Sequence, residues 1–164
     1  ICQLAKATKV ISVTVPSAEL GTPFNEEIER LRRLVSIGVE SGINVSIRSQ
    51  IGCLSENPDT VISLCDNVEG LGITLDPSHY ICGPYDERSC EKLMKYVSHV
   101  HLRDSTEQEL QVRVGQGIIE YGRLVNQLSK VDYRRALCVH IRELPDIDHV
   151  GELRKMRLLL ESLL

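Results

Sequence analysis

The sequence predicts an α/β protein whose strands form part of a (β/α) barrel, and two observations carry that prediction. Five stretches of alternating, β-branched residues are each followed by a stretch with helical periodicity. In addition, one parity rule fits every predicted strand: one face is apolar, and the other face is polar or small. A doubly wound sheet would be apolar on both faces, whereas helices on one side and a polar lumen on the other produce the observed pattern.

The length and composition fit one globular domain. With 164 residues, of which 26% are charged and 42% are hydrophobic, the chain can bury a sizeable core. The net charge of −4 gives no electrostatic reason to expect a nucleic-acid partner. No apolar run reaches the ~18 residues of a membrane span and no signal peptide is visible, so we expect no membrane association.

The cysteine pattern points to a reducing compartment. The six cysteines are scattered without a CxxC pair, which argues against a zinc ribbon or a redox motif. Several of them stand in apolar or strand contexts, where free cysteine behaves as a small hydrophobic residue. A cytoplasmic location is therefore the simplest expectation, although the chain begins at Ile1 rather than at Met.

The first unit follows a short helical segment. Residues 1–6 resemble the tail of a preceding helix, and the alternating β-branched stretch Lys9–Val15 predicts a strand. Phe24 and Asn25 then read as the N-cap of a helix with acidic residues in its first turn and an apolar stripe that stops at Gly42.

The second and third units carry the first candidate for chemistry. Ile43–Arg48 is the second strand, and Asn57 caps a helix that has Pro58 at its first position. Leu71–Asp76 is the third strand, which we expect to be buried on its apolar face and to deliver the carboxylate of Asp76 at its carboxyl end.

The remaining units complete the pattern. A helix near Asp86–Tyr96 precedes the fourth strand, Ser98–Arg103. A longer loop with the turn Gly115-Gln-Gly117 leads to a helix from about Tyr121 to Leu128. The fifth strand, Ala136–Arg142, is followed by a last helix near Val150–Leu163.

Five units do not close an eight-stranded barrel. We therefore expect residues 1–164 to be the C-terminal part of a single (β/α)8 barrel domain and to supply about its last five βα units. Alternatively, the chain assembles as a homo-oligomer in which a second copy covers the two open edges of the sheet.

Four polar residues of the lumen-facing parity stand at strand ends: Arg48, Asp76, His101 and His140. Ligands and metals in α/β folds bind at the carboxyl ends of parallel strands. A carboxylate with imidazoles is a ligand set for Mn, Fe, Co or Zn, and such a metal could polarise a carbonyl or a hydroxyl. Alternatively, these histidines are satisfied residues of the core or the lumen.

At these residues the sequence resembles a known family. The stretch Leu71-Gly-Ile-Thr-Leu-Asp76-Pro-Ser-His79, followed by Val100-His101-Leu-Arg-Asp104, is similar to the xylose isomerase-like TIM barrels. This group contains sugar phosphate isomerases and epimerases and is related to endonuclease IV. The resemblance continues through Val114–Tyr121, which is similar to the family's glycine turn before its final long helix. It covers nearly the whole chain, as the fourth to eighth βα units.

The resemblance implies a site with one metal held by a glutamate, an aspartate, a histidine and a second glutamate, and the two glutamates also move protons. It assigns the aspartate to Asp76 and the histidine to His101, and it brings His79 into contact with substrate. The first glutamate is replaced by Arg48 and the second by His140.

These two replacements change the expected chemistry. Arginine neither ligates a metal nor acts as a base near neutral pH, so Arg48 would instead pair with Asp76 or bind an anionic substrate group such as a phosphate. His140 can serve as a ligand or as a general base. Asp104 would orient His101 or bind substrate; alternatively, it caps the loop after the strand.

Three functions compete at this point. The first is a sugar or sugar-phosphate isomerase or epimerase, with a divalent metal (Mn, Mg, Co or Zn) on Asp76, His101 and His140, and with His79 and His140 as catalytic groups. The second is a degenerate, non-catalytic barrel in which Arg48 and His140 replace the metal-binding glutamates. The third, an abasic-site endonuclease, is opposed by the acidic charge balance and by the two lost glutamates.

Overall fold

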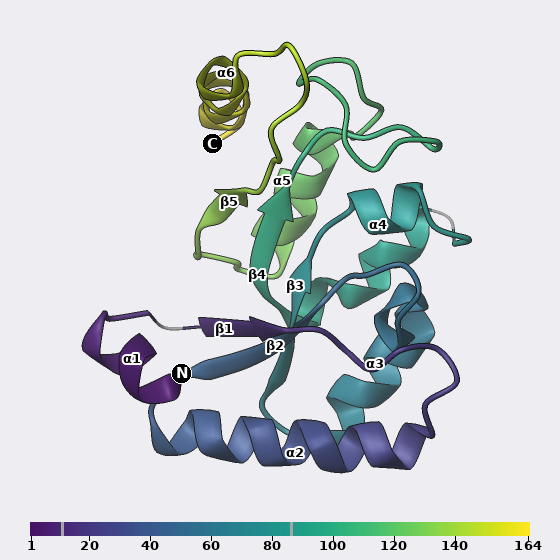
Figure 1. Ribbon diagram of the computed structural model, residues 1–164, viewed down its shortest axis with the longest axis vertical. Helices are drawn as coiled ribbons and strands as arrows, with labels where there is room; N and C mark the ends of the chain where they lie inside the picture. The colour runs from purple at the N-terminus through teal and green to yellow at the C-terminus, as the bar shows by residue number, and fades with distance from the viewer. Residues whose placement is uncertain (11, 86) are drawn as a thin grey trace.

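The fold is built on one curved parallel sheet. The structure is a computed structural model that describes residues 1–10, 12–85 and 87–164. The five strands pair in the order of the chain and are Ser12–Val15 (β1), Asn44–Arg48 (β2), Leu71–Leu75 (β3), Val97–Leu102 (β4) and Leu137–Val139 (β5). In Figure 1, β1 and β2 run across the view while β3 and β4 run along it, so the sheet curves like half of a barrel wall. The predicted partial TIM barrel is confirmed.

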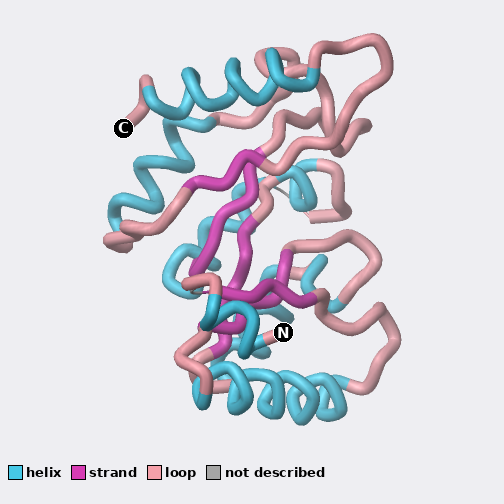
Figure 2. The backbone as a smooth tube through the Cα atoms, turned by 60° about the vertical axis from the view of Figure 1, so that its left-hand side comes forward, coloured by secondary structure: helices cyan, strands magenta, loops and turns pink. Residues whose placement is uncertain are grey.

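Helices connect the strands. They are Cys2–Ala7 (α1), Phe24–Glu40 (α2), Pro58–Asn67 (α3), Ser78–Ile81 (α4), Tyr121–Lys130 (α5) and His149–Glu161 (α6), with 3-10 segments at Leu54–Glu56 (η1) and Glu87–Tyr96 (η2). Figure 2 shows that the longer loops gather on one side of the molecule. None of the described helices is both long and apolar enough to cross a bilayer.

The parity predicted from the sequence appears in the burial of the strands. The helix-facing side chains are almost wholly buried and form the core with the helices: Val45, Ile47, Ile73, Leu75, Val100 and Leu102. On the lumen side, the Thr74 hydroxyl lies 2.8 Å from that of Thr14 and 2.7 Å from that of Ser46. Hydrogen bonding allows these small polar side chains to be buried at little cost.

The ladder between β3 and β4 contains a bulge. Ile73 pairs with Val97, but the next residue, Thr74, pairs with His99, so Ser98 is the extra residue. A Cβ atom at Gly72 would lie 2.5 Å from Ser98 Oγ, so glycine at this position makes room for the bulge.

Several predicted boundaries and element types were wrong. Strand β1 covers Ser12–Val15, so Lys9 and Val10 of the predicted first strand lie outside it. Helix α2 starts at Phe24, and its N-cap is Pro23 rather than Phe24 or Asn25. Here the Pro23 carbonyl accepts from the amides of Glu26 and Glu27, and no side chain caps the helix. Asn57 does cap α3 as predicted, since its side chain accepts from the Asp59 amide.

The segment near Tyr96 is a 3-10 helix rather than an α-helix, and the buried residues Cys90 and Leu93 have the three-residue spacing of that geometry. Strand β5 covers only Leu137–Val139 of the predicted Ala136–Arg142, so His140 follows the strand. Two positions assigned from the sequence, Ile11 in the first strand and Asp86 in the fourth-unit helix, lie outside the described residues.

Candidate functional site

The carboxyl ends of β2 to β5 surround a cavity of about 260 Å³, which we call the rim pocket. Its polar lining consists of Arg48, Ser49, Gln50, Asp76, His79, His101, Arg103, His140 and Arg142. The structure thus brings together all the candidate residues predicted from the sequence except Asp104.

Asp76 is fixed by the turn that follows β3. Its amide donates to Ser49 Oγ at 3.2 Å, and its Oδ1 accepts from the Ser78 amide at 3.2 Å, at the start of the one-turn helix α4. The residue is only 2% exposed. A buried carboxylate needs a positively charged partner or several hydrogen-bond donors. We therefore expect such a partner close to Asp76.

Arg103 is that partner. It directly follows β4 and is 3% exposed. Its Nη2 lies 2.6 Å from Asp76 Oδ2 and 2.8 Å from His140 Nδ1, so one nitrogen bridges the carboxylate and the imidazole. The hydroxyl of Tyr121 donates to the Arg103 carbonyl at 3.0 Å and fixes the backbone. Nε of Arg103 is buried and has no hydrogen-bond partner among the described residues, which leaves one strong donor to be satisfied.

The bond to Arg103 sets the tautomer of His140. A guanidinium can only donate, so Nδ1 of His140 is the acceptor and the proton of the neutral ring is on Nε2. Partial burial, followed by the charge of Arg103, lowers the pKa of His140, and the ring is therefore neutral near pH 7.

His79 is held in a similar way. Its Nδ1 accepts from the Ile51 amide at 3.3 Å, and its Nε2 faces Asp76 Oδ2 at 4.0 Å. Burial lowers the pKa of His79, while the charge of Asp76 opposes that shift. The neutral ring thus carries its proton on the nitrogen that faces the carboxylate.

His101 lies between two other imidazoles. Its ring stacks on His140 with centroids 4.3 Å apart, and His99 approaches it edge-on at 5.1 Å. Burial, together with His140 and His99, lowers the pKa of His101 to about 4. The ring is consequently neutral and only weakly basic.

The sequence led us to consider an ion pair between Arg48 and Asp76, but the structure does not form it. Its Nε donates to Gln50 Oε1 at 2.5 Å, and its side chain is exposed at the edge of the rim pocket. Arg103 reaches Asp76 from the next strand and already neutralises the carboxylate.

Asp104 organises a loop instead of lining the rim pocket. Its Oδ2 accepts from the amides of Gly115 and Gly117 at 2.8 and 3.0 Å, and its Oδ1 accepts from Ser105. At 2% exposure, with its carboxylate oxygens accepting from backbone amides, it has the contacts that the loop-capping alternative predicts, and substrate binding by Asp104 stays a prediction. A Cβ atom at Gly117 would lie 1.9 Å from Asp104 Oδ1, which explains the glycine.

Sequence reasoning missed Arg103, although a signal was present. Arg103 has the same parity as His99 and His101, so the alternation of β4 already directed it toward the lumen. What distinguishes Arg103 from an exposed arginine is its contact with the buried Asp76 at the end of the neighbouring strand. The sequence alone does not show that these two residues are close.

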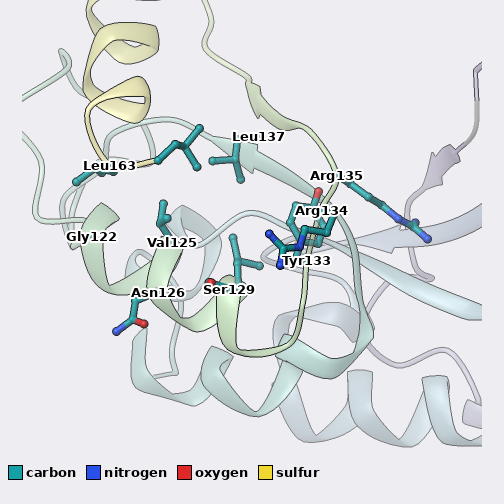
Figure 3. Close-up of a pocket in the computed structure, with 11 residues that line it drawn as sticks. Gly122, Val125, Asn126, Ser129, Tyr133, Arg134, Arg135, Leu137 and Leu163 are labelled. Atoms are coloured by element: carbon teal, nitrogen blue, oxygen red, sulfur yellow. The ribbon is translucent and has the colours of Figure 1, made fainter.

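A second cavity lies away from the rim pocket. With a volume of about 410 Å³, it is bordered by α5, the start of β5 and the residues after α6. Figure 3 shows Leu137 and Leu163 on one side of it and Val125 on the other. Because it is at the amino end of β5, opposite the rim, it holds none of the candidate residues.

Comparison with known proteins gives one family and many structures. The family model described as "Xylose isomerase-like TIM barrel" matches residues 2–158. No protein with a curated description matches the sequence significantly.

Three similar solved structures share the fold at low sequence identity. A D-tagatose 3-epimerase-like protein superposes with a TM-score of 0.80 at 19% identity, covering 99% of this chain and 66% of its own. A xylose isomerase domain protein from Planctomyces limnophilus gives 0.78 at 18% identity, covering 99% and 61%. A xylose isomerase-like TIM barrel protein from Mycobacterium smegmatis, in complex with magnesium, gives 0.76 at 15% identity, covering 99% and 65%. This chain thus spans less than two thirds of each of these proteins.

The rim residues do not fit a divalent ion in this arrangement. Two of the predicted ligand atoms, Asp76 Oδ2 and His140 Nδ1, both contact the same guanidinium nitrogen of Arg103. A metal between them would meet that fixed positive charge at close range. The predicted ligand set of Asp76, His101 and His140 therefore stays a prediction, and it requires Arg103 to leave.

Proposed function

The chain belongs to the xylose isomerase-like TIM barrel family, and from this premise we propose that its rim pocket binds an anionic sugar, such as a sugar phosphate, without a metal ion. The observation that carries the proposal is the guanidinium of Arg103 between Asp76 and His140. Arg103 then supplies the positive charge that a metal ion would otherwise provide. The chain would thus be a non-catalytic member of its family, the second of the three functions considered from the sequence.

The charges of the rim pocket support an anionic ligand. Arg48, Arg103 and Arg142 line it, against the single carboxylate of Asp76. The lowered pKa values of the neighbouring imidazoles leave them neutral near pH 7, so they do not change this balance. Arginine binds phosphate and carboxylate groups through paired donors, and the buried Nε of Arg103 still needs an acceptor.

The hydrogen bonds of the rim pocket argue against proton abstraction. A neutral imidazole has one acceptor nitrogen, and in both His79 and His140 that nitrogen already accepts a hydrogen bond. The Asp76 carboxylate is neutralised by Arg103, and His101 is only weakly basic. Among the described residues of the rim pocket, no strong base is therefore left for the proton transfers of an isomerase.

An isomerase or epimerase remains the second candidate. It is favoured by the Nε2–H groups of His79 and His140, because neutral imidazoles that donate can polarise a substrate carbonyl. A similar structure is also described as D-tagatose 3-epimerase-like. With a divalent metal on Asp76, His101 and His140, this candidate predicts that the metal displaces Arg103.

The proposal includes the domain context. We propose that residues 1–164 are the C-terminal part of one barrel domain. The cysteines of the described part of the chain form no disulfide. A cytoplasmic location and a homo-oligomeric state both stay predictions.

Calorimetric titration tests the proposal. After treatment with a chelator, we expect the chain to bind a hexose phosphate and to bind the unphosphorylated hexose at least about tenfold more weakly, since each hydrogen bond to a charged group contributes about 1.5–3 kcal/mol. Binding that requires added Mn²⁺ or Mg²⁺, or turnover of the sugar, would support the second candidate instead.

Variants distinguish sugar phosphate binding in the rim pocket from nonspecific attraction to surface arginines. Arg103→Gln, combined with Asp76→Asn to avoid a lone buried charge, is expected to lose the preference for the phosphorylated sugar. Arg134→Gln is the matched control, because Arg134 is exposed and pairs with Asp132 outside the rim pocket. An equal effect of both changes would contradict the proposal.

A further inference from the structure

Three metal-ligating side chains meet on the lumen face of β4 and β5. His99 and His101 are two residues apart on β4, so they point to the same face, and the ladder pairs His101 with Cys138 of β5. One ligand atom from each of the three residues lies within 4.8 Å of the other two. All three side chains are half-buried, so a small ion can reach them from the lumen.

These ligand atoms are available, unlike those at the rim. Among the described residues, neither the His99 ring nor the His101 ring has a hydrogen-bond partner, and the two rings contact each other edge-on. The Cys138 thiol has only a long contact of 3.9 Å to the carbonyl of Val139. By contrast, Asp76 and His140 both hold Arg103.

We propose that His99, His101 and Cys138 bind a zinc ion on the lumen wall, with a fourth position open to water or a small ligand. A thiolate with two imidazoles is a borderline-soft donor set that suits zinc rather than magnesium or calcium. Zinc bonds of about 2.0–2.3 Å place tetrahedral ligand atoms about 3.5 Å apart, so small side-chain rotations would close the observed separation.

This site differs from both possibilities at the rim. It uses neither Asp76 nor Arg103, so it does not depend on the proposed sugar binding. His101 belongs to both this site and the predicted rim metal set. Variants of Cys138 therefore report on this site, and variants of Asp76 report on the rim set.

Zinc and cobalt binding to the whole chain test the proposal. Equilibrium dialysis with Zn²⁺ is expected to give one bound ion per chain, and Co²⁺ is expected to show a thiolate-to-cobalt charge-transfer absorption. Cys138→Ser should remove that absorption and weaken zinc binding at least about tenfold, as the loss of even an outer-shell partner does. His99→Gln should weaken zinc binding similarly but retain the thiolate absorption.

Two controls make the result decisive. Cys82→Ser removes another half-buried thiol outside the cluster, and Asp76→Asn combined with Arg103→Gln removes the rim carboxylate without leaving a lone buried charge. Both variants should bind zinc as the parent does, and unfolding curves of all variants show which remain folded. Absence of stoichiometric zinc binding in the parent, or binding that depends on Asp76 and not on Cys138, would overturn the proposal.

Discussion

The guanidinium of Arg103 and the carboxylate of Asp76 form an ion pair of 2.6 Å in which both side chains are at least 96% buried. Removing one partner of such a pair leaves an uncompensated charge in a poorly solvated place. We expect Asp76→Ala to lower the free energy of unfolding by about 3–5 kcal/mol, measured by urea denaturation.

The double variant Asp76→Ala with Arg103→Ala should lose less than the sum of the two single variants, because the partners depend on each other. Glu161→Ala is the control, since it breaks the exposed pair with Arg157 and should change the free energy of unfolding by at most about 0.5 kcal/mol. Strict additivity of the two rim changes would show that the ion pair is not formed.

The turn around Asp104 has no room for a side chain at Gly117. Gly117→Ala should reduce the free energy of unfolding by about 1–3 kcal/mol, because a Cβ atom there would overlap the Asp104 carboxylate that orders the loop. Gly122→Ala, in the first turn of α5, is the matched control: its Cβ would meet only Leu163 at 3.8 Å, and the change should stabilise the helix by up to about 1 kcal/mol. Equal effects of the two substitutions would contradict this account of the loop.

The hydroxyl of Thr74 joins those of Thr14 and Ser46 on the lumen face. Replacing it by the nearly isosteric side chain in Thr74→Val leaves a fully buried Ser46 hydroxyl without this partner. The expected cost is about 1–3 kcal/mol in thermal or urea unfolding. Thr60→Val, in helix α3, is the control. It makes the same chemical change at a threonine whose hydroxyl has no comparable hydrogen bond among the described residues, so it should cost less.

Acid should weaken the fold through His101. Its pKa in the folded chain is about 4, below the value of about 6.5 in an unfolded chain. Between these values the unfolded chain binds a proton that the folded chain does not, so stability falls as the pH decreases from about 6.5 to about 4. The contribution is about 1–2 kcal/mol once solvent screening of this half-buried ring is included.

Urea denaturation at pH 7 and pH 5 measures that slope. In the variant His101→Gln the difference between the two pH values should shrink by this contribution. A slope that is the same in the parent and in His101→Gln would refute the assignment.

Much of the fold was predictable because apolar residues alternate with polar or small residues along each strand. The alternation in Val45–Arg48 and Val100–Leu102 directly reflects which side chains meet the helices, and the structure buries those positions. Ends of elements were less predictable. Strand β5 stops after Val139, and α2 begins at Phe24 without a side-chain cap, since these limits depend on pairing and on backbone carbonyls rather than on residue type.

The candidate site was predictable in its members but not in their pairing. Parity brought Arg48, Asp76, His101 and His140 to one rim, and the rim pocket contains all four. Which arginine neutralises Asp76 depends on side-chain reach across two strands, and Arg48 and Arg103 cannot be told apart by sequence alone. The same holds for Asp104, whose acceptors are taken by amides eleven and thirteen residues further along the chain.

The extra residue at the β3–β4 bulge has a consequence for the whole rim. With regular pairing from Ile73 and Val97 onward, Leu75 would stand beside His99, and every later residue of β4 would exchange faces. Two histidines and Arg103 would then enter the apolar layer under the helices, while Val100 and Leu102 would turn to the lumen. The insertion of Ser98 thus shifts the alternation of β4 by one residue. This shift determines that the polar side chains of β4 face the lumen and that its apolar side chains face the helices.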